Sequence, residues 1–144
     1  HCSFLTYNFD FSRRDPTFVL NNIERDQLGR TVATFDIGAQ VQNSIIYGSL
    51  DNEIALDLDQ SKVRALQVQN NLIRTELMDL DKAGLDNIVN QDPLIINYRN
   101  QEFGIDTLSP AKDIGKTLDP PVLIDFDEVT RDSKPDAGAF ELNY

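Results

Sequence analysis

Apolar and polar residues follow nearly the same six-residue order at two places in the chain. VQNSII at residues 41–46 returns as VQNNLI at residues 68–73, twenty-seven residues later. The first copy is rich in β-branched residues and is followed by Gly48, which is typical of a strand that ends at a turn. Residues 65–69 alternate in the manner of a strand. Both copies are therefore predicted to be strands.

The second copy also fits a helix. Between positions 62 and 81, five apolar residues and one Asn lie at alternating spacings of three and four. This spacing is typical of an amphipathic helix or of a coiled-coil strip with one polar Asn. We favour the strand because two similar phrases should share one conformation if they are equivalent units. Residues 75–86 are then predicted to be a loop or a short helix. The helical row would consist of Val63, Leu66, Asn70, Ile73, Leu77 and Leu80.

A phrase that recurs at a period of about 20–50 residues indicates a solenoid. In a β-solenoid each coil lies about 4.8 Å from the last, so equivalent residues form columns. The apolar pairs that end the two phrases are expected to stack in the interior. Asn43 is expected to stack on Asn70 or Asn71 at a bend, where side-chain amides donate and accept along the column.

Two further segments are predicted to be coils of the same stack. Cys2–Leu5 precedes Asn43–Ile46 by forty-one residues, and the extra length is expected to form a loop around Arg13–Pro16. Asn87–Val89 lies seventeen residues after Asn70 and is a candidate for a later coil. Short apolar segments punctuated by Gly and Pro lie between these phrases, which favours an all-β fold. They are residues 18–20, 31–37, 53–56 and 94–96.

The last part of the chain contains five ordered motifs. They are Asp92-Pro93-Leu94-Ile95, Glu102-Phe103-Gly104-Ile105, Ser109-Pro110-Ala111-Lys112-Asp113-Ile114-Gly115, Asp125-Phe126-Asp127 and Pro135-Asp136-Ala137-Gly138-Ala139-Phe140-Glu141. Together they resemble the ending of secreted bacterial right-handed parallel β-helix proteins of the pectate-lyase-like superfamily. Lys112 and Glu128 depart from the pattern of that family. The resemblance implies a fragment of a right-handed parallel β-helix with long loops, its coils in residues 1–108 and a C-terminal cap in residues 109–144 of the same domain.

A cap has a physical purpose in a solenoid, because the last coil otherwise exposes an unpaired edge and an open apolar end. The prolines of residues 109–144 interrupt strand pairing. Phe140 is expected to fill the end of the core, and Gly115 and Gly138 to occupy positions that a side chain would forbid.

Composition excludes several classes of function. The 144 residues include 13 basic and 24 acidic side chains, for a formal charge of −11, which disfavours nucleic acid and anionic membranes as partners. His1 is the only histidine and Cys2 the only cysteine, so we expect neither a histidine-dependent triad, nor a zinc site, nor an internal disulfide. The chain begins as though within a strand, so upstream coils of a longer chain are expected partners.

Two groups of residues could carry chemistry. Asp57 and Asp59 form an Asp-X-Asp pair that could supply the hard oxygen ligands of calcium, with Glu53 nearby. Alternate carboxylates on one strand also share a face without binding a metal. Arg74 with Asp57 and Glu53 is the arrangement that could act on an acidic polysaccharide, and Tyr47 and Tyr98 could stack on sugar rings.

The resemblance implies an extracellular or cell-surface bacterial protein. We expect a non-catalytic module that is structural or faces a glycan, without a cofactor other than calcium. The alternatives are a polysaccharide lyase or glycoside hydrolase whose active coils lie partly or wholly upstream, and an adhesin-like surface that binds protein.

Overall fold

The fold is all-β. A computed structural model describes residues 1–7 and 12–142 of the chain, and residues 143 and 144 of the predicted cap lie outside this range. In the described residues, the only helical segments are short 3₁₀ turns. The strands are β1 (Ser3–Thr6), β2 (Phe18–Asn21), β3 (Ile23–Arg25), β4 (Thr31–Thr34), β5 (Ile37–Gln42), β6 (Ile45–Gly48), β7 (Ile54–Asp57), β8 (Val63–Gln69), β9 (Leu72–Ile73), β10 (Ile88–Val89), β11 (Ile95–Asn97) and β12 (Glu102–Ile105). The 3₁₀ turns are η1 (Gln60–Lys62), η2 (Met78–Asp81) and η3 (Tyr98–Asn100).

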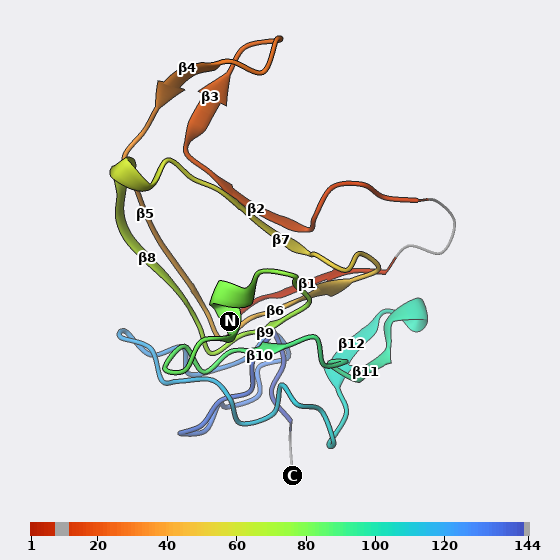
Figure 1. The fold of residues 1–144 in the computed structure, drawn as a ribbon. Coiled ribbons are helices and arrows are strands. Elements are labelled where there is room, and N and C mark those ends of the chain that lie inside the picture. The colour runs from red at the N-terminus through yellow and green to blue at the C-terminus, as the bar shows by residue number, and fades with distance from the viewer. Residues whose placement is uncertain (8–11, 143–144) are drawn as a thin grey trace.

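Three parallel sheets organise the first ninety residues. The strand orders are β1-β6-β9-β10, β2-β7 and β5-β8, and every pairing within them is parallel. The chain visits the three sheets in a fixed order, through β1, β2 and β5, then β6, β7 and β8, and then β9. Figure 1 shows the sheets as three sides around a common interior. No helix within the described residues is long and apolar enough to cross a bilayer.

The repeated phrase occupies equivalent places in neighbouring strands, as predicted. Val41 pairs with Val68 in β5 and β8, and Ile46 pairs with Ile73 in β6 and β9. The competing helix over residues 62–81 is wrong, because these residues form β8, β9 and the short turn η2. The predicted loop or short helix at residues 75–86 is confirmed.

The first and last coils were predicted one residue out of register. β1 pairs with β6 at a separation of forty-two residues, so that Phe4 lies beside Ile46 and not Ile45. β10 pairs with β9 at a separation of sixteen, with Ile88 beside Leu72. A shift of one residue exchanges the two faces of a strand.

The separation between β1 and β6, forty-two residues, exceeds the twenty-seven between β6 and β9, and the additional residues lie in two places. One is the predicted loop around Arg13–Pro16, between β1 and β2. The other is the antiparallel hairpin of β3 and β4, which projects away from the parallel sheets in Figure 1. The strand predicted at residues 31–37 is confirmed in part: β4 covers Thr31–Thr34, but the chain leaves the hairpin at Phe35 and Asp36, and Ile37 begins β5.

The bend between the β5-β8 sheet and the β1-β6-β9-β10 sheet is built from two polar columns. Asn43, Asn70 and Asp86 each adopt a left-handed conformation, with φ of 52°, 57° and 53°. Asn is one of the few residues with a side chain that enters this region readily. The residues that follow them carry the hydrogen bonds between strands: Asn71 Oδ1 accepts from the Ser44 amide at 2.9 Å, and the Asn71 amide donates to Asn87 Oδ1 at 3.0 Å. Asn43, Asn70 and Asp86 therefore turn the chain, and the column of Ser44, Asn71 and Asn87 carries the hydrogen bonds between neighbouring strands.

The interior is apolar and is covered at one end by the segment after β9. Val41, Ile46, Ile54, Val68 and Ile73 are buried together with Leu80. Leu80 belongs to η2, and Leu77 just before it packs on the same cluster. The segment around η2 thus shields the apolar interior from solvent at the end of the sheets where β8 and β9 lie.

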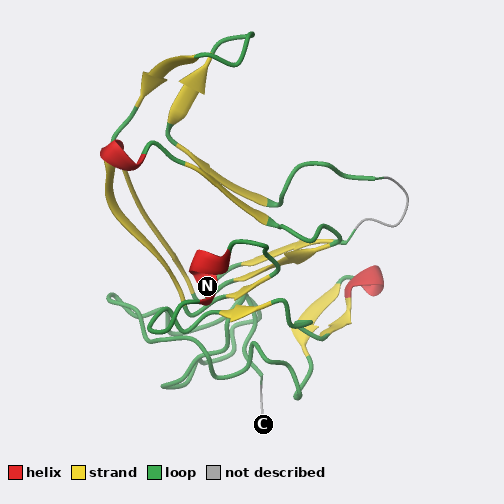
Figure 2. Ribbon diagram, viewed as in Figure 1, coloured by secondary structure: helices red, strands yellow, loops and turns green. Residues whose placement is uncertain are grey.

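The C-terminal segment, residues 109–142, covers the outside of the β1-β6-β9-β10 sheet. Ile45 and Leu72 point away from the interior and are buried against Ala111 and Ala137. Figure 2 shows this segment as loops that run beneath the sheet. Phe140 packs edge-to-face on Phe126, with ring centroids 5.7 Å apart, and lines a groove beside the outward-facing Leu5, so it does not fill the end of the interior as predicted.

Candidate functional site

The register of the sheet places Tyr47 and Arg74 next to each other on the outer face. Each residue directly follows one of the paired residues Ile46 and Ile73, which point inward. Because side chains alternate along a strand, Tyr47 and Arg74 point outward. The guanidinium carbon of Arg74 lies 5.6 Å from the centroid of the Tyr47 ring, which is cation–π geometry.

Two more tyrosines join this pair. The Tyr7 ring lies 4.3 Å from the Tyr98 ring at an interplanar angle of 14°, which is a stacked arrangement. The centroid of the Tyr7 ring is also 6.1 Å from the centroid of the Tyr47 ring. All three rings are half-buried, so part of each remains open to solvent. We call Tyr7, Tyr47, Tyr98 and Arg74 the tyrosine surface.

Arg74 is fixed by hydrogen bonds on both of its terminal nitrogens. Nη1 donates to the Gly48 carbonyl at 2.9 Å, and Nη2 donates to Asp51 Oδ1 at 2.6 Å. Tyr47, Asp51 and Arg74 line a shallow hollow whose remaining wall is made by Thr75, Glu76 and Asn90. This hollow offers charged and amide groups beside the aromatic rings, as a site for a hydroxyl-rich ligand requires.

The hydroxyls of Tyr7 and Tyr47 keep their protons at neutral pH, because the pKa of each is raised. Burial raises the pKa of Tyr7, and the negative charge of Asp92 raises it further. The same two causes, in the same order, raise the pKa of Tyr47. Both phenols can therefore donate a hydrogen bond to a ligand as well as accept one.

Glu53, predicted to face a ligand, is instead a buried structural anchor. Its side chain is fully buried and is ion-paired with Arg13. Thr17 donates to the carboxylate through its amide at 3.1 Å and its hydroxyl at 2.7 Å, and the Leu50 amide donates at 2.9 Å. Burial raises the pKa of Glu53, but the hydrogen bonds from Arg13, Thr17 and Leu50 together outweigh burial and leave the pKa below its ordinary value. Glu53 thereby holds the loop between β1 and β2 against the turn before β7.

Asp57 and Asp59 have separate partners. Arg25 binds both oxygens of Asp57, and this hydrogen-bonded pairing lowers the pKa of that carboxyl group. Asp59 caps η1 by accepting from the hydroxyl of Ser61 at 2.7 Å and its amide at 3.0 Å, which lowers its pKa. In the described part of the chain, no group of three or more His, Cys, Asp or Glu side chains could hold a metal ion. Calcium binding at Asp57 and Asp59 stays a prediction.

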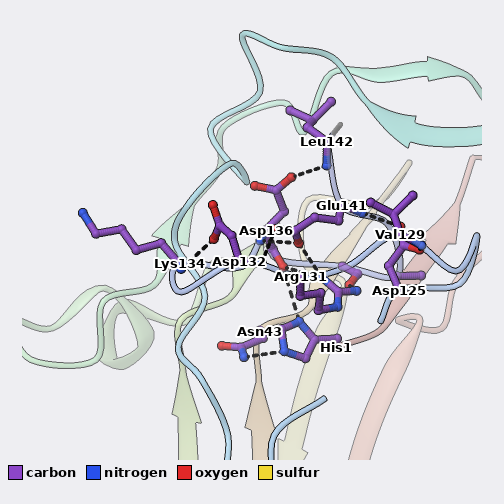
Figure 3. Close-up of polar contacts among 12 residues, drawn as sticks. His1, Asn43, Asp125, Val129, Arg131, Asp132, Lys134, Asp136, Glu141 and Leu142 are labelled. Atoms are coloured by element: carbon purple, nitrogen blue, oxygen red, sulfur yellow. Dashed lines mark hydrogen bonds and ion pairs between the residues drawn. The ribbon is translucent and has the colours of Figure 1, made fainter. Parts of the chain in front are cut away.

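The acidic residues of the C-terminal motifs form a buried network, which Figure 3 shows. Arg131 donates to Glu141 Oε2 and to the Gly138 carbonyl, each at 2.9 Å. Asp136 accepts from the amides of Asp113 and Leu142, both at 2.8 Å. These acids are occupied by donors within the same segment, so they hold the loops together.

The network also fastens the C-terminal segment to the first strands. His1 lies between them, with Nδ1 3.3 Å from the Asp136 carbonyl and Nε2 2.9 Å from Asn43 Nδ2. The Asn43 carbonyl accepts from the Gly138 amide at 2.9 Å. A side chain at Gly138 would collide with Ser3, and its φ of 107° is rare for other residues, as was predicted for this position.

A larger groove, of about 750 Å³, lies between the C-terminal segment and the β11–β12 hairpin. Leu5, Ile96, Phe103, Phe126 and Phe140 supply most of its side-chain wall. An apolar wall of this kind suits an apolar ligand better than a sugar rich in hydroxyl groups.

The structure brings together three of the five residues that the sequence suggested for ligand binding. Tyr47, Arg74 and Tyr98 meet on the outer face, whereas Glu53 and Asp57 are bound to Arg13 and Arg25. Tyr7 was missed. Leu5 pairs with Tyr47, and Tyr7 lies two residues further along the same strand direction, so the correct register would have placed it on the same side.

Comparison with known proteins adds no relative: no protein-family model, curated protein or solved structure matches the chain.

Proposed function

We propose that the chain is part of a right-handed parallel β-helix of a secreted bacterial protein of the pectate-lyase-like kind, and that it binds carbohydrate without catalysis. Three parallel sheets visited in a constant order support the solenoid. Crossovers between parallel strands are right-handed in nearly all proteins, which supports the hand. The ordered motifs of residues 92–141 support the family and its extracellular location.

The convergence of Tyr7, Tyr47 and Tyr98 beside Arg74 carries the functional part of this proposal. The face of a pyranose ring is lined with C–H groups that pack on an aromatic ring, and its rim of hydroxyls needs hydrogen-bond partners. Tyrosine supplies both an apolar face and a polar tip. Arg74, Thr75 and Asn90 provide donors and acceptors at the side of the rings.

Binding is favoured over catalysis because the charged residues suggested for chemistry are already engaged. A lyase would need a base free to take a proton from the substrate, and a hydrolase would need two carboxylates across the scissile bond. Arg74 is paired with Asp51, Glu53 with Arg13 and Asp57 with Arg25. These pairs fix side chains in place, which suits a binding surface.

A glycan array tests the proposal. The purified chain is expected to bind at least one class of oligosaccharide, and the double variant Tyr47→Ala/Tyr98→Ala is expected to lose that binding by about tenfold or more, since stacking on a ring contributes about 1–3 kcal/mol for other planar ligands. Leu28→Ala is the control, because Leu28 is an exposed apolar residue at the tip of the β3–β4 hairpin. Circular dichroism of each variant checks the fold. Absence of binding by the unaltered chain would contradict the proposal.

A further inference from the structure

The charge around the tyrosine surface constrains which sugars can bind there. Asp51 and Glu76 line the hollow with Arg74, and Asp92 is close enough to raise the pKa of both Tyr7 and Tyr47. Even when Arg99, beside Tyr98, is counted with Arg74, the three carboxylates outnumber the two guanidinium groups. The surroundings of the rings are therefore net negative.

Arg74 is poorly placed to recruit an acidic sugar. Its Nη2 is held by Asp51 at 2.6 Å and its Nη1 by the Gly48 carbonyl. A uronate carboxylate that approached this guanidinium group would compete with a carboxylate of the same charge. The two anions would lie within a few ångströms of each other, where like charges repel strongly even near a protein surface.

The charge of the whole chain acts in the same direction. A formal charge of −11 repels polyanions at long range, and this repulsion extends about 10 Å beyond the surface at 0.1 M salt. Uncharged sugars are indifferent to this field. They still gain the aromatic faces of the tyrosines and hydrogen bonds with the hydroxyls of Tyr7 and Tyr47, whose pKa values are raised.

We infer that the tyrosine surface selects uncharged oligosaccharides and discriminates against chains of uronic acid. The inference rests on the proposed function, since it names the class of sugar bound at the same surface. Asp51 is the residue that sets the discrimination, because it neutralises the arginine that would otherwise attract a carboxylate.

Isothermal titration calorimetry with two sets of hexasaccharides tests this selectivity. Glucan, mannan and xylan hexasaccharides serve as uncharged probes, and hexagalacturonate serves as the acidic probe. The dissociation constant for hexagalacturonate is expected to be at least about tenfold higher than for the best uncharged probe, as like-charge contacts suppress wrong partners. Equal or tighter binding of hexagalacturonate would overturn this inference alone. Failure of every probe to bind would overturn the proposed function together with it.

Asp51→Asn isolates the cause. The variant leaves Arg74 without its carboxylate partner, and hexagalacturonate is expected to bind about threefold or more tightly than to the unaltered chain, on the scale of an exposed ion pair. The matched control is Asp36→Asn, which removes the exposed carboxylate paired with Arg64 near β5. Asp36→Asn is expected to leave hexagalacturonate binding unchanged. The inference is overturned if Asp51→Asn has no larger effect than the control.

Discussion

The side-chain amide of Asn71 donates a hydrogen bond to the Val41 carbonyl at 2.9 Å, across thirty residues of sequence. Its oxygen accepts from the Ser44 amide, so one fully buried side chain satisfies two backbone groups on either side of the bend between β5 and β6. Buried backbone groups without partners are costly, and the chain bends here, where the ladder of strand hydrogen bonds is interrupted. Asn71 takes the place of the missing ladder bonds.

Asn71→Ala is therefore expected to lower the free energy of unfolding by about 2–4 kcal/mol, because it leaves buried donors and acceptors unsatisfied. Urea denaturation followed by circular dichroism measures the change. Asn100→Ala is the control, since Asn100 is exposed in η3 and its truncation is expected to cost less than about 0.5 kcal/mol. Equal costs for the two variants would show that the column at Asn71 does not stabilise the stack.

Gly48 at the end of β6 is closely surrounded. An added Cβ would collide with Oε1 of Glu53 and with the carbonyl and hydroxyl oxygens of Thr6. Gly48→Ala is expected to destabilise the fold by about 1–3 kcal/mol, the usual cost of overpacking. Gly38→Ala in β5 is the matched change, because its nearest neighbour would be the Ala65 carbonyl at 3.9 Å. A thermal unfolding midpoint that falls equally in both variants would contradict the crowding at Gly48.

The buried pair of Glu53 and Arg13 predicts a dependence of stability on pH. The folded state lowers the pKa of Glu53, so Glu53 stabilises the fold above its unfolded pKa of about 4.3, and this contribution is lost as the pH falls through the lower folded pKa. Glu53→Gln leaves the Arg13 charge without its partner and is expected to cost about 3 kcal/mol at neutral pH.

Urea denaturation of both proteins between neutral pH and about pH 3 checks this dependence. The difference in unfolding free energy between the unaltered chain and Glu53→Gln is expected to shrink as the solution becomes acidic. Glu141, whose pKa is raised by burial, contributes a pH dependence of stability with the opposite sign. Because Glu141 is present in both proteins, its contribution cancels in the difference. A difference that stays constant across this range would contradict the ion pair.

The sequence predicted the pairing of neighbouring strands where two similar phrases fixed its register. Val41 and Val68 could be aligned because the phrases around them agree at four of six positions. The alignment at Phe4 failed by one residue because both faces of that sheet are buried, one in the interior and the other under the C-terminal segment. Apolar residues then occupy both faces, and alternation no longer distinguishes them.

The candidate site was harder to predict because its members come from four parts of the chain. Tyr98 reaches the surface from η3, which joins the strands of the β11–β12 hairpin, and no spacing in the sequence determines the position of that hairpin. Glu53 seemed available for chemistry because its partner, Arg13, lies forty residues away in the sequence. Residue type suggested sugar stacking at Tyr47 and Tyr98, but only the packing of the strands reveals which charges are already paired.

Tyrosine fluorescence tests the central claim most directly, because the chain has no Trp and three of its four tyrosines belong to the tyrosine surface. Titration with the uncharged hexasaccharide that calorimetry identifies is expected to change the tyrosine emission along a saturable curve. The curve should give the same dissociation constant as calorimetry, and Tyr47→Ala/Tyr98→Ala should abolish it. Calorimetric binding with no change in tyrosine emission would place the sugar elsewhere on the molecule and contradict the account.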